Sequence, residues 1–224
     1  MTTQPLIFLA GASRGVGREI ALRLVANPSY RVKALLRSEA ARPDLEAIGL
    51  TVVMGDALDP VAIAQAMQGD SIAAVISTIG GLPQEGQRSD YLGNRNLIDA
   101  AVAAGVGQFI LVSSIGSGNS AVALAPHILE ALRPVLIEKD KAEQHLIASG
   151  LTYTIIRPGG LKSEPATGNG VLIQDPTIAG SIHRADVADL VCRCLQAPPA
   201  FNQVFSAVDR QMLYGTPDLQ PVVW

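Results

Sequence analysis

The sequence has few cysteines and histidines, and this shortage excludes two kinds of protein. Only 2 of the 224 residues are cysteine and 3 are histidine. So few residues cannot form a disulfide framework, and the histidines have no companions at the spacing of a zinc site. Cys192 and Cys194 stand two apart in an apolar, helix-like stretch, where they point to different faces. We expect two buried free thiols and no metal.

Charge of either sign is also scarce, at 17% of residues, and neither sign predominates. Seventeen Lys and Arg against 20 Asp and Glu leave a net charge of -3. A chain without a basic surplus lacks the electrostatic attraction that nucleic acid requires. The apolar run at 6–10 is too short for a signal peptide or a membrane span. We therefore expect a cytoplasmic protein with neither a nucleic acid nor a membrane as partner.

Hydrophobic residues, by contrast, make up 48% of the chain, and they are arranged in a regular alternation. Short continuous apolar runs are followed by segments whose apolar residues recur at helical spacing. Strands that lack polar alternation are buried on both faces, which indicates a parallel, doubly wound α/β sheet. The expected strands are 6–10, 32–36, 51–54, 72–77, 109–112 and 152–156, and the expected helices are 14–26, 40–48, 61–67, 91–104 and 136–148.

The alternation stops after Pro158. Residues 159–181 are rich in Gly, Pro and Ser, and only 171–173 are strand-like. A further helix at 184–195 and a last strand at 203–207 follow. We expect one domain over 1–224, with the sheet and its helices in 1–158 and a lid with C-terminal elements in 159–224.

A glycine-rich turn joins the first strand to the first helix. Residues 11–17 read Gly-Ala-Ser-Arg-Gly-Val-Gly. Glycines allow such a turn to close and a ligand to approach the backbone, while the helix N-terminus favours negative charge. The context of strand, turn and helix therefore predicts a dinucleotide diphosphate site.

The glycine spacing and four further segments resemble the short-chain dehydrogenase/reductase superfamily, over nearly the whole chain. The similarity is to its atypical members, the NAD(P)-binding group with NmrA-like proteins and biliverdin reductase B, also called flavin reductase. Residues 55–57 resemble the adenine-binding segment, 77–81 the loop beside the nicotinamide ribose, 112–114 the strand end with the active-site serine, and 149–160 the sixth strand with its cofactor-side loop. The resemblance implies a Rossmann-type fold.

The turn and the resemblance together assign a set of residues to the cofactor. A carboxylate at the end of the second strand would indicate NAD(H), but Arg37 and Ser38 stand there instead. With Arg14 from the glycine turn, Arg37 can clamp a 2′-phosphate, so we expect NADP(H). The expected cofactor-binding residues are Gly11, Ser13, Arg14, Gly15, Val16, Gly17, Arg37, Ser38, Asp56, Ala57, Thr78, Gly80, Ser113, Lys139, Pro158 and Gly159.

The catalytic pattern of the superfamily is incomplete. Its proton donor is a tyrosine four residues before a lysine, and here Lys139 matches the lysine while Val135 stands in the tyrosine's place. A valine cannot transfer a proton, which disfavours the interconversion of simple alcohols and ketones. Ser114 and Lys139 are the expected catalytic residues.

Two functions remain open. In the first, the protein is an NADPH-dependent reductase of a planar conjugated small molecule, a flavin or a tetrapyrrole, whose ring spreads the incoming charge. Biliverdin reductase B also lacks the tyrosine. In the second, the protein binds NADP(H) as a regulator or assembly factor, as NmrA-like proteins do. Either could act as a monomer or a dimer.

Two segments are expected to wall the substrate side, because both follow the carboxyl ends of strands. They are residues 115–133 and 159–181. Their apolar side chains are candidates for a slot that takes a planar ring, and His127 is a weaker candidate for a proton source. The slot candidates are Leu124, Ile128, Leu129 and Leu161.

Overall fold

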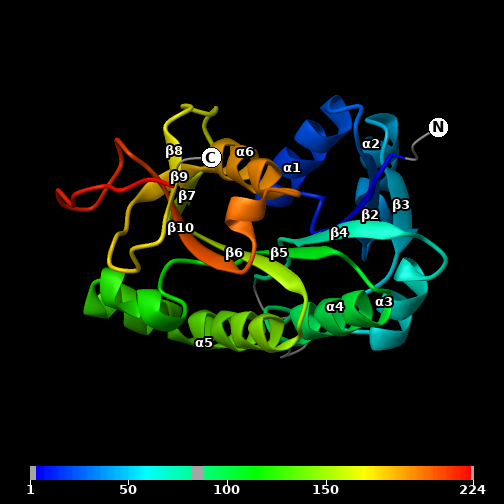
Figure 1. Cartoon of the computed structure of the whole chain (residues 1–224), viewed down its shortest axis with the longest axis horizontal. Coiled ribbons are helices and arrows are strands. Elements are labelled where there is room, and N and C mark those ends of the chain that lie inside the picture. The colour runs from blue at the N-terminus through cyan, green and yellow to red at the C-terminus, as the bar shows by residue number, and fades with distance from the viewer. Residues whose placement is uncertain (1–3, 82–87, 223–224) are drawn as a thin grey trace.

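A sheet of eight strands runs through the middle of the molecule (Figure 1). The structure is a computed structural model that describes residues 4–81 and 88–222. The strands lie in the order β3-β2-β1-β4-β5-β6-β10-β8, and all neighbours are parallel except β10 and β8. Their bounds are β1 Leu6–Ala10, β2 Arg31–Leu36, β3 Thr51–Met54, β4 Ile72–Ser77, β5 Gln108–Val112, β6 Thr152–Pro158, β8 Gly170–Ile173 and β10 Gln203–Asp209. This order confirms the doubly wound α/β fold.

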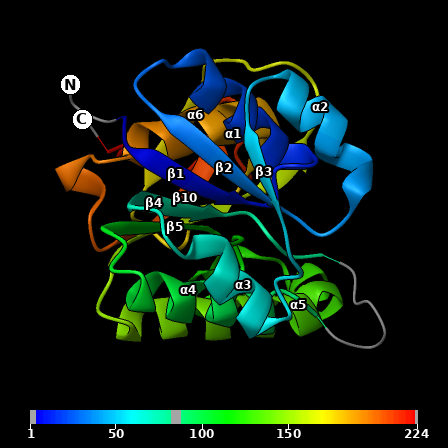
Figure 2. The ribbon, with the colours of Figure 1, turned by 90° about the vertical axis from the view of Figure 1, so that its right-hand side faces the viewer.

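Helices cover both faces of the sheet (Figure 2). On one face lie α1 (Gly15–Ala26) and α6 (Arg184–Cys194). On the other lie α3 (Pro60–Met67), α4 (Leu92–Ala103) and α5 (Pro126–Ala148). The short α2 (Arg42–Ala47) follows a 3-10 turn at Glu39–Ala41.

The central strands are continuously apolar because each contributes side chains to two cores. In β1, Ile7 and Leu9 join the core that contains α1 and α6 residues. Phe8 joins the opposite core, with residues of α3, α4 and α5. Successive strand side chains point to opposite faces, so a strand covered on both sides has no place for alternating polar residues.

The helix α5 begins earlier than the sequence pattern indicates. It was expected over 136–148, but it begins at Pro126 and is 23 residues long. Pro126 occupies the first helical turn, where its missing N–H costs nothing, and the helix continues through Pro134 despite the donor lost there. The expected wall at 115–133 is therefore largely helical, with a 3-10 turn at Gly118–Ala123 before α5. Among the described helices, none combines the length and the apolar character needed to cross a membrane.

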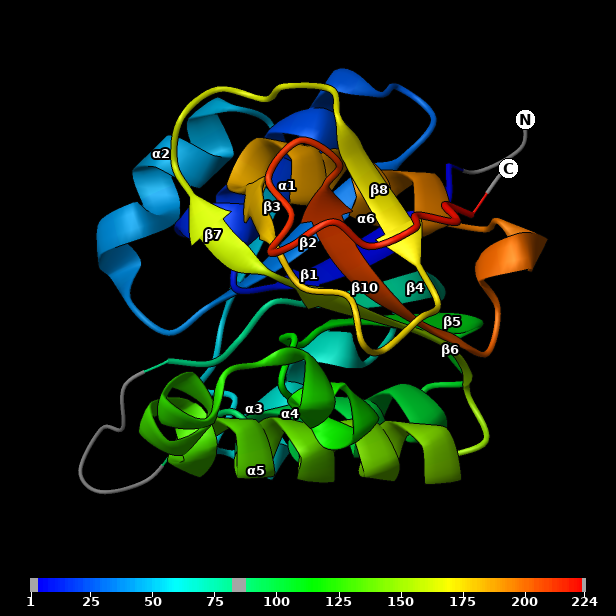
Figure 3. The ribbon, with the colours of Figure 1, turned by 90° about the vertical axis from the view of Figure 1, so that its left-hand side faces the viewer.

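The segment after Pro158 also contains more regular structure than expected. Two short strands, β7 (Gly160–Lys162) and β9 (Ser181–His183), pair in parallel beside the main sheet. Figure 3 shows β7 and β8 at the end of the molecule where the C-terminal loop also lies. Strand β8 extends the sheet, as its edge strand, by pairing with β10, which runs parallel to β6.

Both cysteines are free thiols on α6; Cys194 is buried as expected, whereas Cys192 is only partly buried. Desolvation raises the pKa of Cys192 from its usual value of 9.0 to about 11 and that of Cys194 to about 12. Since the thiolate is the reactive form, we expect both to resist iodoacetamide at mildly alkaline pH in the folded protein. Mass spectrometry should find both alkylated once the chain is unfolded in urea. Rapid alkylation without denaturant would contradict this environment.

Candidate functional site

The site lies where the order of the strands reverses. Chain connections run outward in opposite directions from β1 and β4, so their carboxyl ends open a crevice. There the Thr78 N–H donates to the carbonyl of Ala10 at 3.0 Å. A cavity of about 710 Å³ opens at this point. Its size lies in the range of sites for small molecules and cofactors.

The glycine turn forms one wall of the cavity, and its geometry requires glycine. A Cβ added at Gly17 would lie 2.1 Å from the carbonyl oxygen of Gly11 and 2.6 Å from Thr78 Oγ1. No side chain fits there, and α1 therefore starts directly against the end of β1. Arg14, at the N-cap of α1, makes no side-chain cap. The first N–H groups of the helix remain available to a diphosphate.

Most of the expected residues line this one cavity. Pro158 and Gly159 do not. The Pro158 carbonyl accepts the Ile115 N–H, and a Cβ at Gly159 would lie 2.1 Å from the Gly180 carbonyl oxygen, so this segment packs against its neighbours. The expected residues that line the cavity are Gly11, Ser13, Arg14, Gly15, Val16, Gly17, Arg37, Ser38, Asp56, Ala57, Thr78, Gly80, Ser113, Ser114 and Lys139.

Three arginines surround the cavity, and one was missed from the sequence. Arg14 and Arg37 are exposed, and neither has a carboxylate partner within the described residues. The third, Arg184, is the first residue of α6 and donates to Ser163 Oγ at 2.7 Å. A Cβ on Gly15 would lie 3.7 Å from its Nε. Because 169 positions separate Arg184 from Gly15, no local pattern could have identified it.

The loop after β3 contributes Asp56 and Ala57. Asp56 Oδ1 accepts the N–H of Leu58 at 2.9 Å, which fixes the turn that follows β3. The Ala57 carbonyl accepts from Asn96 Nδ2 at 2.9 Å, so α4 holds the same loop from behind. This part of the cavity wall is thus held by hydrogen bonds within the loop and from α4.

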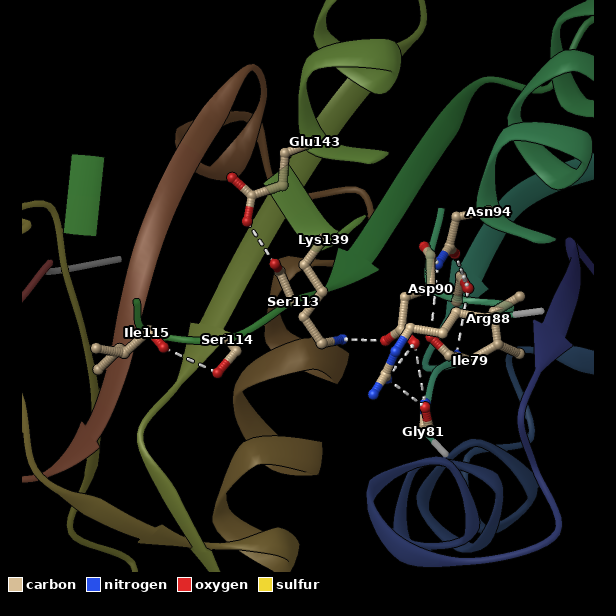
Figure 4. Close-up of polar contacts among 11 residues, drawn as sticks. Ile79, Gly81, Arg88, Asp90, Asn94, Ser113, Ser114, Ile115, Lys139 and Glu143 are labelled. Atoms are coloured by element: carbon tan, nitrogen blue, oxygen red, sulfur yellow. Dashed lines mark hydrogen bonds and ion pairs between the residues drawn. The ribbon is translucent and has the colours of Figure 1, made fainter. Parts of the chain in front are cut away.

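Two serines that directly follow β5 also line the cavity, and Figure 4 shows their hydrogen bonds. Ser113 donates to the buried carboxylate of Glu143, which also receives Arg157 Nη2 at 2.5 Å. Ser114 Oγ donates to the Ile115 carbonyl at 2.9 Å. With their protons engaged, both hydroxyls can act toward a further partner only as acceptors.

Lys139 of α5 lines the cavity, whereas Val135, one turn earlier, does not. Lys139 Nζ lies 3.4 Å from Oδ1 of Asp90, a residue that the sequence analysis did not consider. None of the described tyrosines lines the cavity either. The described cavity wall therefore contains the lysine of the superfamily's Tyr–Lys pair but not the tyrosine.

The remaining sequence candidates are mostly elsewhere. Of the four residues proposed for an apolar slot, only Leu161 lines the cavity. Leu124 packs against a small core with Ile115, and Ile128 and Leu129 lie on the first turns of α5. His127 is exposed on the same turns and is not part of the wall.

A buried polar cluster fastens the segment that leads from β7 to β8. One imidazole nitrogen of His183 and one carboxylate oxygen each of Asp186 and Asp209 lie within 4.8 Å of one another. None of these residues lines the cavity. Asp186 accepts the N–H groups of Thr167 and Gly168 at 2.9 and 2.8 Å, and Asp209 accepts from Thr167 Oγ1 at 2.5 Å. These carboxylates are satisfied by hydrogen bonds that hold the segment to α6 and β10.

Comparison with known proteins agrees with this geometry. Residues 11–198 match the model of a family described as NAD(P)H-binding. A Bacillus subtilis protein named uncharacterized sugar epimerase YhfK is 35% identical over 91% of this chain and 94% of its own length. Sanguinarine reductase from Eschscholzia californica is 31% identical over 89% of this chain and 87% of its own.

A solved structure is similar over the whole fold. It is described as ChuY, an anaerobillin reductase from Escherichia coli O157:H7, and it superimposes with a TM-score of 0.83 at 36% identity. The match covers 97% of this chain and 100% of that one. The family match and the similar proteins confirm the resemblance to atypical short-chain dehydrogenases/reductases, and they indicate an oxidoreductase-like protein. The chain belongs to the NAD(P)H-binding family of Rossmann-fold proteins.

Proposed function

We propose that the protein is an NADPH-dependent reductase of a planar conjugated acceptor, with a flavin or a biliverdin-like tetrapyrrole as the first candidates. One observation carries the proposal. The cavity combines the glycine turn and Lys139 with no described tyrosine in its wall, and Val135, which matches the donor's position in the sequence, lies outside that wall. Such a site suits an acceptor that needs no strong acid.

The residues of the cavity divide into two groups. The glycine turn takes the diphosphate, and Arg14 and Arg37 take the 2′-phosphate, which would distinguish NADPH from NADH. When bound, NADPH supplies the hydride. Lys139 orients the nicotinamide ribose, and Ser114 accepts a hydrogen bond from the acceptor ring. The acceptor's developing negative charge spreads over its ring, and its proton comes from water.

The relatives support reduction as the reaction. One is named a sanguinarine reductase, and the similar structure is described as an anaerobillin reductase. Leu161 and Ile79 contribute apolar surface to the cavity wall. Apolar wall surface favours the binding of a planar ring, because the ring buries apolar area against it.

An aerobic assay of NADPH oxidation tests the proposal. The acceptors are riboflavin, FMN, biliverdin, quinones and a simple ketone, each with an enzyme-free control. Oxidation with a planar acceptor and none with the ketone is the expected result. Activity on the ketone alone would contradict the proposal, and tight NADPH binding without turnover would favour the regulator.

The variant Ser114→Ala should lower turnover by a modest factor. A neutral hydrogen bond contributes roughly 0.5–1.5 kcal/mol, which corresponds to about a twofold to tenfold change. Val135→Phe is the control, since Val135 does not line the cavity and its effect should come only through packing. Steady-state kinetics with the best acceptor measure both. Equal turnover in Ser114→Ala and the parent would contradict the proposed hydrogen bond between Ser114 and the acceptor.

A further inference from the structure

Asp90 lies two residues before the start of α4, and its buried carboxylate has no role assigned so far. Its exposed fraction is 0%, and no hydrogen bond from a described residue reaches its Oδ1. The other oxygen, Oδ2, accepts the N–H of Gly81 at 3.3 Å and lies 3.5 Å from Arg88 Nη1. Burial of a carboxylate is costly unless positive charge compensates it. Arg88 compensates only one side.

Lys139 supplies the positive charge on the other side. Its Nζ lies 3.4 Å from Asp90 Oδ1, and its side chain is 17% exposed. Figure 4 shows the Lys139 side chain reaching toward Asp90. Low exposure weakens solvent screening, so this pair interacts more strongly than ion pairs on the surface.

The adjoining loop is shaped to admit this pair. A Cβ at Gly80 would lie 2.5 Å from Asp90 Oδ1 and 3.3 Å from Lys139 Nζ. Any other residue at this position would therefore displace the carboxylate, the ammonium or both. Gly80 lies in the cavity wall, so the ammonium stands at the cavity's edge.

The backbone of Asp90 is held by a hydrogen-bond network. Its backbone carbonyl accepts from Asn94 Nδ2 at 2.7 Å, and Asn94 Oδ1 accepts from the buried Ser77 at 2.6 Å. Ser77 is the last residue of β4, so the network ties Asp90 to the sheet. A carboxylate on a backbone anchored in this way, with Oδ2 also bonded to the Gly81 N–H, can fix the position of a flexible side chain.

We propose that Asp90 is a positioning residue that holds the Lys139 ammonium beside Gly80, where it can donate to the ribose of the nicotinamide half of the cofactor. This inference rests on the cofactor site of the proposed function. A free lysine side chain populates many rotamers, and holding it in one reduces the entropy lost when the cofactor binds. Asp90 thus acts through Lys139 and need not touch the cofactor.

A double-mutant cycle tests this role. It compares the parent with Asp90→Asn, Lys139→Met and the double variant. Asparagine preserves the shape and can still accept from Gly81, but it removes the charge that faces Lys139. Calorimetry measures the Kd of NADPH and, as a matched control, that of adenosine 2′,5′-bisphosphate, which lacks the nicotinamide half.

We expect Asp90→Asn to raise the Kd of NADPH about tenfold and to leave the Kd of the bisphosphate unchanged. In the Lys139→Met background the same substitution should change the NADPH Kd by less than about twofold, because the partner is already absent. An equal effect in both backgrounds would overturn the proposal. So would a loss of bisphosphate binding, which would mean that Asp90 maintains the loop and not the lysine.

The cycle is independent of turnover. Failure to reduce any acceptor would contradict the reductase proposal while the binding energies still decide the role of Asp90. Conversely, an active reductase without coupling between Asp90 and Lys139 would overturn only this inference.

Discussion

We expect the variant Arg37→Asp to bind NADH more tightly than NADPH. Arg37 stands at the end of β2, exposed at the cavity and without a carboxylate partner among the described residues. An aspartate there would repel a 2′-phosphate and accept hydrogen bonds from the free ribose hydroxyls. A charge-assisted contact contributes roughly 1.5–3 kcal/mol, so the ratio of the two Kd values should shift by about one to two orders of magnitude.

The control is Arg42→Asp, which changes the net charge equally. Arg42 lies at the start of α2, pairs with Glu39 and Glu46, and does not line the cavity. Calorimetric titration of both cofactors into both variants separates a local contact from the field of the whole protein. An unchanged preference in Arg37→Asp, or the same shift in Arg42→Asp, would contradict the assignment of the phosphate to Arg37.

The second large effect concerns stability. Glu143 has an exposed fraction of 0% and binds the guanidinium of Arg157, itself 5% exposed, together with Ser113. Glu143→Ala would leave the Arg157 charge buried without its partner. Removal of one member of such a pair costs about 3–5 kcal/mol, and we expect the free energy of unfolding to fall by that amount. Urea denaturation followed by circular dichroism measures it.

An exposed ion pair on the same helix provides the comparison. Arg133 Nη1 lies 3.3 Å from Glu130 Oε2, and the side chains of Glu130 and Arg133 are 73% and 65% exposed. Glu130→Ala should change the free energy of unfolding by only about 0–1 kcal/mol. If Glu143→Ala were no more destabilising than Glu130→Ala, the buried pair would not stabilise the wall behind Ser113.

Much of the fold could be predicted because the relevant signals are local. A strand such as Leu6–Ala10, covered on both faces, must be apolar throughout, and the glycine turn must follow it directly. The start of α5 was missed because Pro134 lies inside the helix. Strands β7 and β9 are three residues each, too short for a periodic pattern.

The residues of the site that could be predicted either follow a strand in the sequence or, like Lys139 on α5, match a motif of the resembled family. Arg37 and Ser114 closely follow strand ends, and Arg14 lies in the glycine turn after β1, where ligands bind in such sheets. Arg184 and Asp90 come from helix starts distant in the chain, and only the folded structure brings them to Gly15 and Lys139. Long-range pairs of this kind leave no spacing signal in one sequence.

A single turnover without oxygen tests the proposed reduction most directly. The protein, in excess over NADPH, is mixed anaerobically with a flavin or biliverdin, and cofactor and acceptor are followed by absorbance. We expect equimolar loss of NADPH and of oxidised acceptor, much faster than in the mixture without protein. Tight binding of NADPH with no loss of either absorbance for any planar acceptor would contradict the reductase function and leave an NADP(H)-binding regulator.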